Sequence, residues 1–359
     1  ARERSSSRSR ATSDPASIPS LLKAPTAANL IRVFGLQERL KALGKEGDFK
    51  AAHVHVVGAG TMGGDIAAWC ALRGLTVTLQ DQNAERLAPA MARAAKLFAA
   101  PLRDPRRVRD ATDRLLPDVA GDGVARADVI IEAIFENVDA KRSLFAALEA
   151  KAKPGAILAT NTSSIPLEDI ATAMADPTRL IGLHFFNPVA KMMLVEIVVG
   201  RTTRAELIAP AAAFARQIDR LPLPVKSAPG FLVNRVLAPY LMAAMRCVDE
   251  GIAPETVDEA ALAFGMPMGP IELADTVGLD ICVAVGRMLT PAATPPKKWT
   301  ELVTAGHLGR KTKRGFYDYA SGKPAKQAAG AVPAGLADRL IGPFVAEAKA
   351  ALAEGIVAD

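Results

Sequence analysis

The feature that most constrains the fold is a glycine-rich run at residues 58–63 (GAGTMG) between two short periodic segments. Residues 53–57 (HVHVV) predict a strand, and residues 65–73 (DIAAWCALR) predict a helix that stops at Gly74. A G-x-G-x-x-G run alone is weak evidence, but a strand directly before it and a helix directly after it are its informative context. A strand–turn–helix unit of this kind opens an α/β sheet.

The positions of the glycines predict a pyrophosphate site. Gly58 permits the tight turn, Gly60 allows close backbone approach to the phosphates, and Gly63 lets helix and strand pack closely. The following helix N-terminus offers free N–H groups and a partial positive charge. Asp81 ends the second predicted strand, where a carboxylate accepts hydrogen bonds from a ribose 2′-hydroxyl and repels a 2′-phosphate, which favours NAD over NADP. The predicted cofactor-binding residues of this unit are Gly58, Gly60, Thr61, Gly63 and Asp81. A purely structural glycine turn is the alternative.

The remaining pattern predicts two domains. Strands are expected at 75–79, 129–131, 156–160, 180–185 and 194–199, with helices at 84–100 and 138–152. This alternation is typical of an open, mostly parallel Rossmann-like sheet with helices on both faces. After Ser227 the strands cease, and helices at 230–250, 255–264 and 272–289 predict an all-α C-terminal domain. The predicted fold class is therefore α/β, a dinucleotide-binding sheet followed by an all-α domain.

The charge distribution argues against a nucleic-acid-binding protein. The formal net charge is +6 and the pI is about 9.3. Residues 1–50 carry a net +5 and residues 297–314 another +5, so the rest of the chain is mildly acidic. No apolar run approaches the ~20 residues that span a bilayer. Three widely spaced cysteines form neither a disulfide framework nor a zinc motif, which favours a reducing compartment, here the cytoplasm.

Polar residues within or just after apolar strands are the candidates for chemistry. Residues 161–164 (NTSS) directly follow a strand, and ligands bind at the carboxyl edge of such sheets. His184 and Glu196 each lie within an apolar strand. A buried carboxylate is costly unless it is paired, and pairing with an imidazole would fix the tautomer and raise the basicity of the ring. A histidine in an apolar strand is often a plain core residue, but the second buried ionisable group and the upstream glycine loop favour the catalytic interpretation.

Taken together, these segments resemble the L-3-hydroxyacyl-CoA dehydrogenase family from about residue 51 to residue 319. The segments that carry the resemblance are Gly58–Gly63, residues 131–137 (IEAIFEN) with Lys141, residues 161–164, residues 184–188 (HFFNP), Glu196 and residues 229–235 (PGFLVNR). Residues 21–50 resemble the connecting segment of bacterial multifunctional fatty-acid oxidation proteins. On that resemblance the chain is the dehydrogenase part of such a protein, without its hydratase part.

The resemblance implies NAD-dependent oxidation of (3S)-3-hydroxyacyl-CoA to 3-oxoacyl-CoA in fatty-acid β-oxidation. His184 matches the general base and Glu196 the residue that orients it, while Ser163 and Asn234 match side chains that hold the substrate and its reacting oxygen. Positions that match NAD contacts are Met62, Asp81, Ile134, Glu136, Lys141, Ser163 and Asn187. Lys141 could equally be a surface lysine. The family often has proline where Met193 stands, so the geometry between His184 and Glu196 is open.

An internal repeat suggests how the chain is divided. Residues 235–255 and 339–359 keep Arg, Pro, an aromatic residue, Ala, Glu, Gly and Ile in register at an offset of 104. Duplication is preferred over chance similarity of two Ala-rich helices. The expected division is a tail and linker helix at 1–50, an NAD-binding domain at 51–227, a helical domain at 228–319, a linker at 320–338 and the truncated start of a second helical copy at 339–359. An exposed apolar face on the helical domain predicts a homodimer or poor solubility.

Several alternatives stay open. The chain could be a catalytically incompetent fragment that still binds NAD, or a dehydrogenase of free hydroxy acids, although those enzymes typically use a lysine as base. The basic segment 297–314 could contact CoA phosphates or be a solvated loop. His53 and His55 are expected to be strand residues and His307 a loop residue, without catalytic roles.

Overall fold

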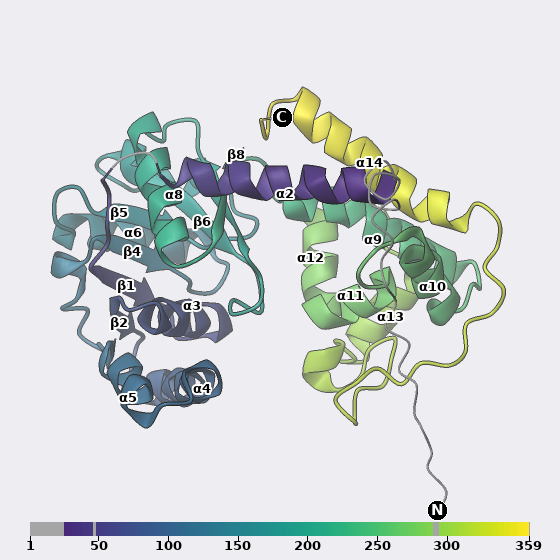
Figure 1. Ribbon diagram of the computed structural model, residues 1–359, viewed down its shortest axis with the longest axis horizontal. Helices are drawn as coiled ribbons and strands as arrows, with labels where there is room; N and C mark the ends of the chain where they lie inside the picture. Colours follow the sequence, from purple (N-terminus) through teal and green to yellow (C-terminus); the bar gives the residue numbers. More distant parts are fainter. Residues whose placement is uncertain (1–24, 46–47, 290–293, 359) are drawn as a thin grey trace, which may run out of the picture.

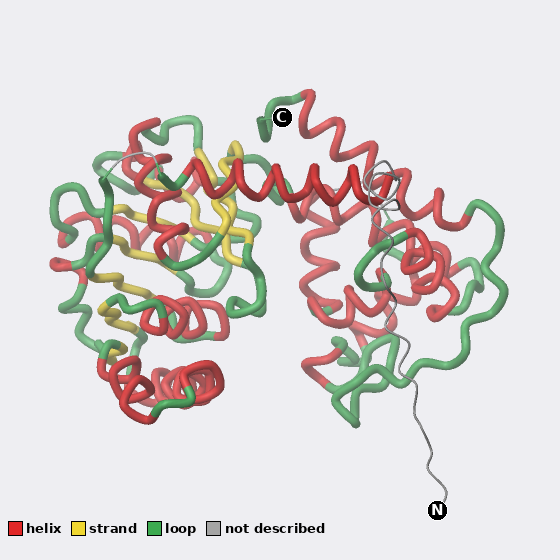
Figure 2. The backbone as a smooth tube through the Cα atoms, viewed as in Figure 1, coloured by secondary structure: helices red, strands yellow, loops and turns green. Residues whose placement is uncertain are grey.

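The computed structural model describes residues 25–45, 48–289 and 294–358. The chain forms two lobes, one around a β-sheet and one entirely helical, and Figure 2 shows the strands confined to the first. Within these ranges no helix has the length and apolar character needed to cross a bilayer.

The sheet contains eight strands in the order β3-β2-β1-β4-β5-β6-β7-β8. Neighbouring strands are parallel, except that β6 and β7 are antiparallel. This arrangement confirms the predicted Rossmann-like, mostly parallel sheet. The strands are β1 (His53–Val57), β2 (Thr76–Gln80), β3 (Leu115–Pro117), β4 (Val129–Glu132), β5 (Ile157–Thr160), β6 (Leu180–Phe185), β7 (Leu194–Val199) and β8 (Leu221–Lys226).

Helices cover both faces of the sheet and build the second lobe (Figure 1). In the sheet lobe they are α3 (Thr61–Leu72), α4 (Ala84–Leu102), α5 (Pro105–Asp113), α6 (Val138–Lys151), α7 (Leu167–Ala171) and α8 (Ile208–Gln217). The helical lobe contains α9 (Val233–Asp249), α10 (Pro254–Phe264), α11 (Pro270–Val277), α12 (Leu279–Leu289), α13 (Lys297–Thr304) and α14 (Leu336–Ala353). The helical C-terminal part is thereby confirmed.

Alternation along the strands divides the core of the sheet lobe between its two faces. Val129 and Ile131 pack with α3, α4 and α8, whereas Ile130, between them, packs with α6 and α7. The polar residues Glu132 and Thr160 continue the second set, so they lie on the face that α6 covers.

The structure corrects several sequence-based boundaries. Helix α5 and strand β3 were not predicted, because α5 buries only Ala111 and β3 has three residues. Strand β8 contains Pro222 and Pro224, which sequence patterns disfavour in a strand, and it is tolerated because β8 lies at the sheet edge. The single helix expected at 272–289 is broken at Gly278, whose φ is 107°. Residues 297–304 form helix α13 rather than the loop expected for the basic segment.

Helix α2 (Pro25–Leu43) precedes the sheet and extends towards the helical lobe (Figure 1). It ends where Gly44 packs against α8, and a Cβ atom there would approach Arg216 Cγ to 1.9 Å. Five of its apolar side chains are exposed: Leu30, Ile31, Val33, Phe34 and Leu36.

Helices α9 and α14 contact each other through equivalent positions of the sequence repeat. Arg235 binds Glu354 at 2.7 Å, and Arg339 binds Glu250 at 2.7 Å. Each arginine and each glutamate lies 104 residues from its counterpart in the other helix. Tyr240 and Phe344, also 104 residues apart, meet edge to face with ring centroids 6.0 Å apart. Reciprocal contacts of this kind are those of two copies packed around a two-fold axis.

Candidate functional site

The glycine loop joins β1 to α3 at the carboxyl edge of the sheet. Gly58 has φ of 104°, and a Cβ atom on it would lie 2.5 Å from the carbonyl oxygen of Ala133. A Cβ atom on Gly63 would lie 1.9 Å from the carbonyl oxygen of Gly58, so helix and strand approach too closely for any side chain. A Cβ atom on Gly60 would meet nothing within 4 Å. Two glycines are therefore required by packing, and the third borders open space.

This loop fits a dinucleotide pyrophosphate. Helix α3 begins at Thr61, and its N-cap residue Gly60 has no side chain to bind the first N–H groups. These free donors and the helix dipole suit phosphate oxygens. Asp81 directly follows β2, and its carboxylate accepts a 2.7 Å hydrogen bond from the Ala59 N–H. Asp81 is thus anchored to the loop beside the predicted position of the adenine ribose.

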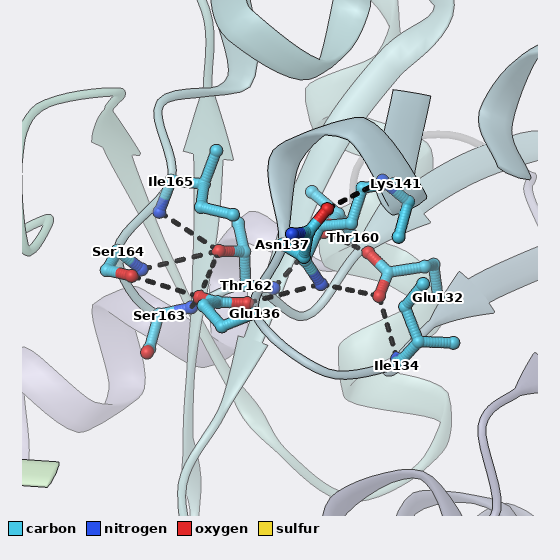
Figure 3. Close-up of polar contacts among 11 residues, drawn as sticks. Glu132, Ile134, Glu136, Asn137, Lys141, Thr160, Thr162, Ser163, Ser164 and Ile165 are labelled. Atoms are coloured by element: carbon cyan, nitrogen blue, oxygen red, sulfur yellow. Dashed lines mark hydrogen bonds and ion pairs between the residues drawn. The ribbon is translucent and has the colours of Figure 1, made fainter. Parts of the chain in front are cut away.

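A buried ionic cluster follows β4 and involves residues of α6. Glu132 is fully buried, and its two carboxylate oxygens accept hydrogen bonds from three donors. These donors are Lys141 Nζ at 2.6 Å, Thr160 Oγ1 at 2.6 Å and the Ile134 N–H at 2.8 Å. Lys141 is 1% exposed, so the surface interpretation of this residue is wrong. Figure 3 shows Glu132, Lys141 and Thr160 converging from separate elements.

Glu136 extends this cluster to the loop after β5. Its carboxylate lies 3.2 Å from Lys141 Nζ and accepts hydrogen bonds from the Ser163 N–H and Ser164 Oγ at 3.0 Å and from Thr162 Oγ1 (Figure 3). Burial opposes ionisation of Glu136, but the Lys141 charge and these donors outweigh it and lower its pKa. Glu136 therefore holds the 161–165 loop as an anionic acceptor.

His184 and Glu196 face each other across the antiparallel β6–β7 pair. They are register partners, and His184 Nδ1 lies 2.7 Å from Glu196 Oε2. The imidazole is 5% exposed and lies beside Phe186 and Phe231, with ring centroids 4.5 and 5.6 Å away. When Glu196 accepts a hydrogen bond from Nδ1–H, the Nε2 lone pair is left free to accept a proton. Among the described residues, Nε2 has no hydrogen-bond partner.

The second oxygen of Glu196 binds the start of helix α9. Oε1 accepts hydrogen bonds from the backbone N–H groups of Leu232 and Val233, both at 2.9 Å. These are among the donors that a helix N-terminus leaves unpaired. One fully buried carboxylate therefore joins the imidazole on the sheet to the first helix of the other lobe.

Ser163 and Asn234 meet next to this junction. The Asn234 side-chain nitrogen donates a 3.3 Å hydrogen bond to the Ser163 carbonyl oxygen. The Ser163 hydroxyl extends away from the Glu136 cluster (Figure 3), and it has no hydrogen-bond partner within the described ranges. It is thus a free donor beside the lobe junction.

The structure brings most of the predicted site residues to one edge of the sheet. Asn187 is exposed in the loop that follows β6, and its peptide bond to Pro188 is cis. Glu132 and Thr160 were not predicted as site residues, and Thr162 was predicted only as part of the 161–164 segment. The one available signal was a second glutamate in the 131–137 segment, four residues before Glu136.

The weaker candidates have structural explanations. His55 is buried, with Thr78 Oγ1 at 2.8 Å from Nδ1 and Gln80 Oε1 at 2.9 Å from Nε2, and His53 bonds the same threonine. Lys311, in the basic segment, binds Asp280 at 2.6 Å. Cys70, Cys247 and Cys282 are buried free thiols.

Comparisons with known proteins agree with this geometry. Residues 53–228 match the family model described as 3-hydroxyacyl-CoA dehydrogenase, NAD binding domain. Residues 230–319 match the 3-hydroxyacyl-CoA dehydrogenase C-terminal domain. The resemblance seen in the sequence is thereby confirmed.

Individual relatives match different shares of the chain. A probable 3-hydroxybutyryl-CoA dehydrogenase of Bacillus subtilis is 38% identical over 277 residues, which cover 74% of this chain and 96% of that protein. The fatty acid oxidation complex subunit alpha of Psychrobacter arcticus is 36% identical over 85% of this chain, which spans only 45% of that relative. The crystal structure of (S)-3-hydroxybutyryl-CoA dehydrogenase from Ralstonia eutropha is similar with a TM-score of 0.71 and 36% identity, over 76% of this chain and 100% of that one.

Gly60 and Gly63 make a matched pair for testing the phosphate loop. We expect Gly63→Ala to destabilise the protein by about 1–3 kcal/mol, because its methyl group overlaps the Gly58 carbonyl. Gly60→Ala should fold normally but bind NADH more weakly, because its methyl group occupies the space that faces the phosphates. Thermal unfolding and titration of NADH fluorescence measure the two effects. Normal NADH affinity in Gly60→Ala would contradict the assigned role.

The buried Glu132–Lys141 pair predicts a non-additive stability effect. Lys141→Met should cost about 3–5 kcal/mol of unfolding free energy, because it leaves a buried carboxylate without its countercharge. Adding Glu132→Gln should recover part of that loss, since the uncompensated charge is then removed. Urea unfolding of both variants tests this, with Lys151→Met, an exposed lysine of the same helix, as control. A double variant less stable than Lys141→Met would rule out the explanation.

Proposed function

Because the chain belongs to the 3-hydroxyacyl-CoA dehydrogenase family of NAD-dependent oxidoreductases, we propose that it oxidises (3S)-3-hydroxyacyl-CoA to 3-oxoacyl-CoA. The observation that carries the proposal is the His184–Glu196 pair, whose free Nε2 lies on the sheet face that also carries the Glu132 and Glu136 cluster. The names of the relatives favour a short acyl chain and a role in fatty-acid oxidation.

In this proposal His184 is the general base. Nε2 removes the C3 hydroxyl proton of the substrate while the C3 hydrogen leaves as hydride and the carbon–oxygen double bond forms. NAD, when bound to the 58–63 loop, supplies the hydride acceptor. Through its hydrogen bond to Nδ1, Glu196 stabilises the imidazolium that results. The rings of Phe186 and Phe231 shield the imidazole, which strengthens its interaction with Glu196.

The remaining site residues position the reactants. The free hydroxyl of Ser163 is suited to donate a hydrogen bond to the reacting oxygen, and Asn234 supports the same loop from α9. Met62, Asp81, Ile134, Glu136 and Asn187 would line the NAD site. Lys141 contributes through Glu136 rather than as an isolated cation, because its ammonium group already binds two carboxylates.

The proposal extends to organisation and setting. We assign residues 51–227 to the NAD-binding domain, 228–319 to the helical domain and 339–359 to the start of a second helical copy, supported by the reciprocal contacts of α9 and α14. The buried free thiols support a cytoplasmic location. The remaining specific assignment, β-oxidation, is supported by the names of the relatives alone.

The test is NADH-dependent reduction of acetoacetyl-CoA. His184→Gln should lower kcat by about 10²–10⁴-fold, because the proton then lacks a positioned acceptor or donor. NADH affinity should stay near that of the wild type, which separates loss of chemistry from loss of folding. His53→Gln, at the opposite end of a strand from the glycine loop, serves as the control and should retain activity.

Full turnover in His184→Gln would refute the role of His184 as general base. NADH binding without any wild-type turnover would favour a catalytically incompetent fragment. Assays with a panel of free hydroxy acids test the remaining alternative, a dehydrogenase that acts on free acids and not on CoA thioesters.

We further propose self-association through the helical lobe. Its exposed large apolar side chains include Phe264, Ile281, Val345 and Leu352, and exposed apolar surface often marks a contact. Because α14 already occupies one side of α9, the contact would form beside this helix pair. Light scattering at micromolar concentration should therefore show a dimer. A stable monomer under those conditions would contradict the expectation.

A further inference from the structure

Arg220 is a buried cation without a carboxylate partner. It lies just before β8, is 2% exposed, and forms no ion pair with any described residue. Its neighbour Asp219 binds Arg73 instead, at 2.9 Å. A buried charge is costly unless other groups stabilise it. What surrounds the guanidinium therefore indicates why a charged residue is accommodated here.

The guanidinium is stabilised by one aromatic ring and two carbonyl groups. Its Cζ atom lies 3.7 Å from the ring centroid of Trp69, a residue of α3. One nitrogen donates to the Asp219 carbonyl at 2.7 Å and the other to the Val189 carbonyl at 2.6 Å. The first bond is local, but the second connects residues 31 positions apart. Desolvation lowers the pKa of Arg220 to about 10, so the group stays charged at neutral pH.

Val189 belongs to the loop between β6 and β7, residues 186–193. This loop carries Phe186, whose ring lies beside the His184 imidazole, and Asn187, a proposed NAD contact. The Leu221 N–H, next to Arg220, donates a 2.7 Å hydrogen bond to the Met193 carbonyl oxygen. Residues 220 and 221 therefore hold the loop at two points.

We propose that Arg220 is a positioning residue that holds the 186–193 loop, and with it Asn187, in the conformation that binds NAD. The inference rests on the proposed function for the role of Asn187. Trp69 gives Arg220 a fixed platform, because its indole N–H donates a 2.7 Å hydrogen bond to the Ile218 carbonyl. Since Trp69 lies in the last turn of α3, the guanidinium contacts both the helix that follows the glycine loop and the 186–193 loop.

The experiment compares Arg220→Met with Arg220→Lys. Methionine keeps most of the apolar stem but leaves the Val189 carbonyl without its donor, so KM for NAD should rise about tenfold while kcat changes little. Lysine can still donate one hydrogen bond to Val189 and should recover most of the affinity. Arg73→Met is the matched control, because Arg73 also lies over Trp69, at 4.3 Å, but does not bind the loop.

A direct NADH titration by fluorescence accompanies the kinetics. A weaker NADH affinity in Arg220→Met than in Arg73→Met, with rescue by Arg220→Lys, supports the proposal. If Arg220→Met lowers the unfolding temperature but binds NADH like the wild type, Arg220 is only a stabilising residue. Equal loss of affinity in Arg73→Met overturns it as well. Because this titration needs no acyl-CoA, its outcome is independent of whether the wild-type protein turns over the proposed substrate.

Discussion

The rest of the site depends on the hydrogen bonds that the Glu196 carboxylate accepts. One oxygen binds the His184 imidazole and the other binds two N–H groups at the start of α9. A buried carboxylate in this position is stable only while both sets of donors are present, since an unpaired buried charge costs several kcal/mol. The requirement works in both directions: α9 cannot leave without removing partners from Glu196, and Glu196 cannot be neutralised without changing the imidazole. Orientation of the His184 imidazole and attachment of the helical lobe are therefore one electrostatic arrangement.

The second buried cluster, around Glu132, Lys141 and Glu136, likewise uses single side chains to make several contacts. Lys141 forms ion pairs with both Glu132 and Glu136. Glu136 in turn accepts hydrogen bonds from three donors in the loop after β5. That loop presents the free Ser163 hydroxyl and, through the Ser163 carbonyl, receives the Asn234 amide from α9. The two clusters thus meet at Ser163 and Asn234. Each pairs ionisable side chains that are buried, where polar interactions are stronger and their geometry more restrictive than in water.

The parts of the fold and site that depend on local sequence patterns could be predicted, and those that depend on contacts between distant segments could not. The glycine loop was predictable from its spacing between a strand pattern and a helix pattern, and the apolar strands β6 and β7 matched their predicted bounds. The constraint on Gly63 is local, because Gly63 packs against the Gly58 carbonyl, whereas Gly58 packs against Ala133 from another strand–loop segment. The direct pairing of His184 with Glu196 required the antiparallel register, which strand patterns do not contain. The burial of Lys141 was not predictable because its partners come from β4 and the loop that follows it, whereas helical periodicity reports only one face of α6. Arg220 gave no signal at all, since Trp69 and Val189 are distant in sequence.

The packing of α14 against α9 affects the site because it fixes the rotation of α9 about its own axis. Asn234 and Arg235 are adjacent, so a rotation that moves one moves the other. Arg235 is held by Glu347 of α14 at 2.5 Å and by Glu354, the residue that caps the end of α14. These ion pairs are partly exposed and individually modest, but they act at the end of α9 that also donates to Glu196. A helix fixed at its N-terminus by a buried carboxylate and along its side by a repeat-related neighbour has little freedom to turn. In this chain the repeat therefore helps to determine where Asn234 points.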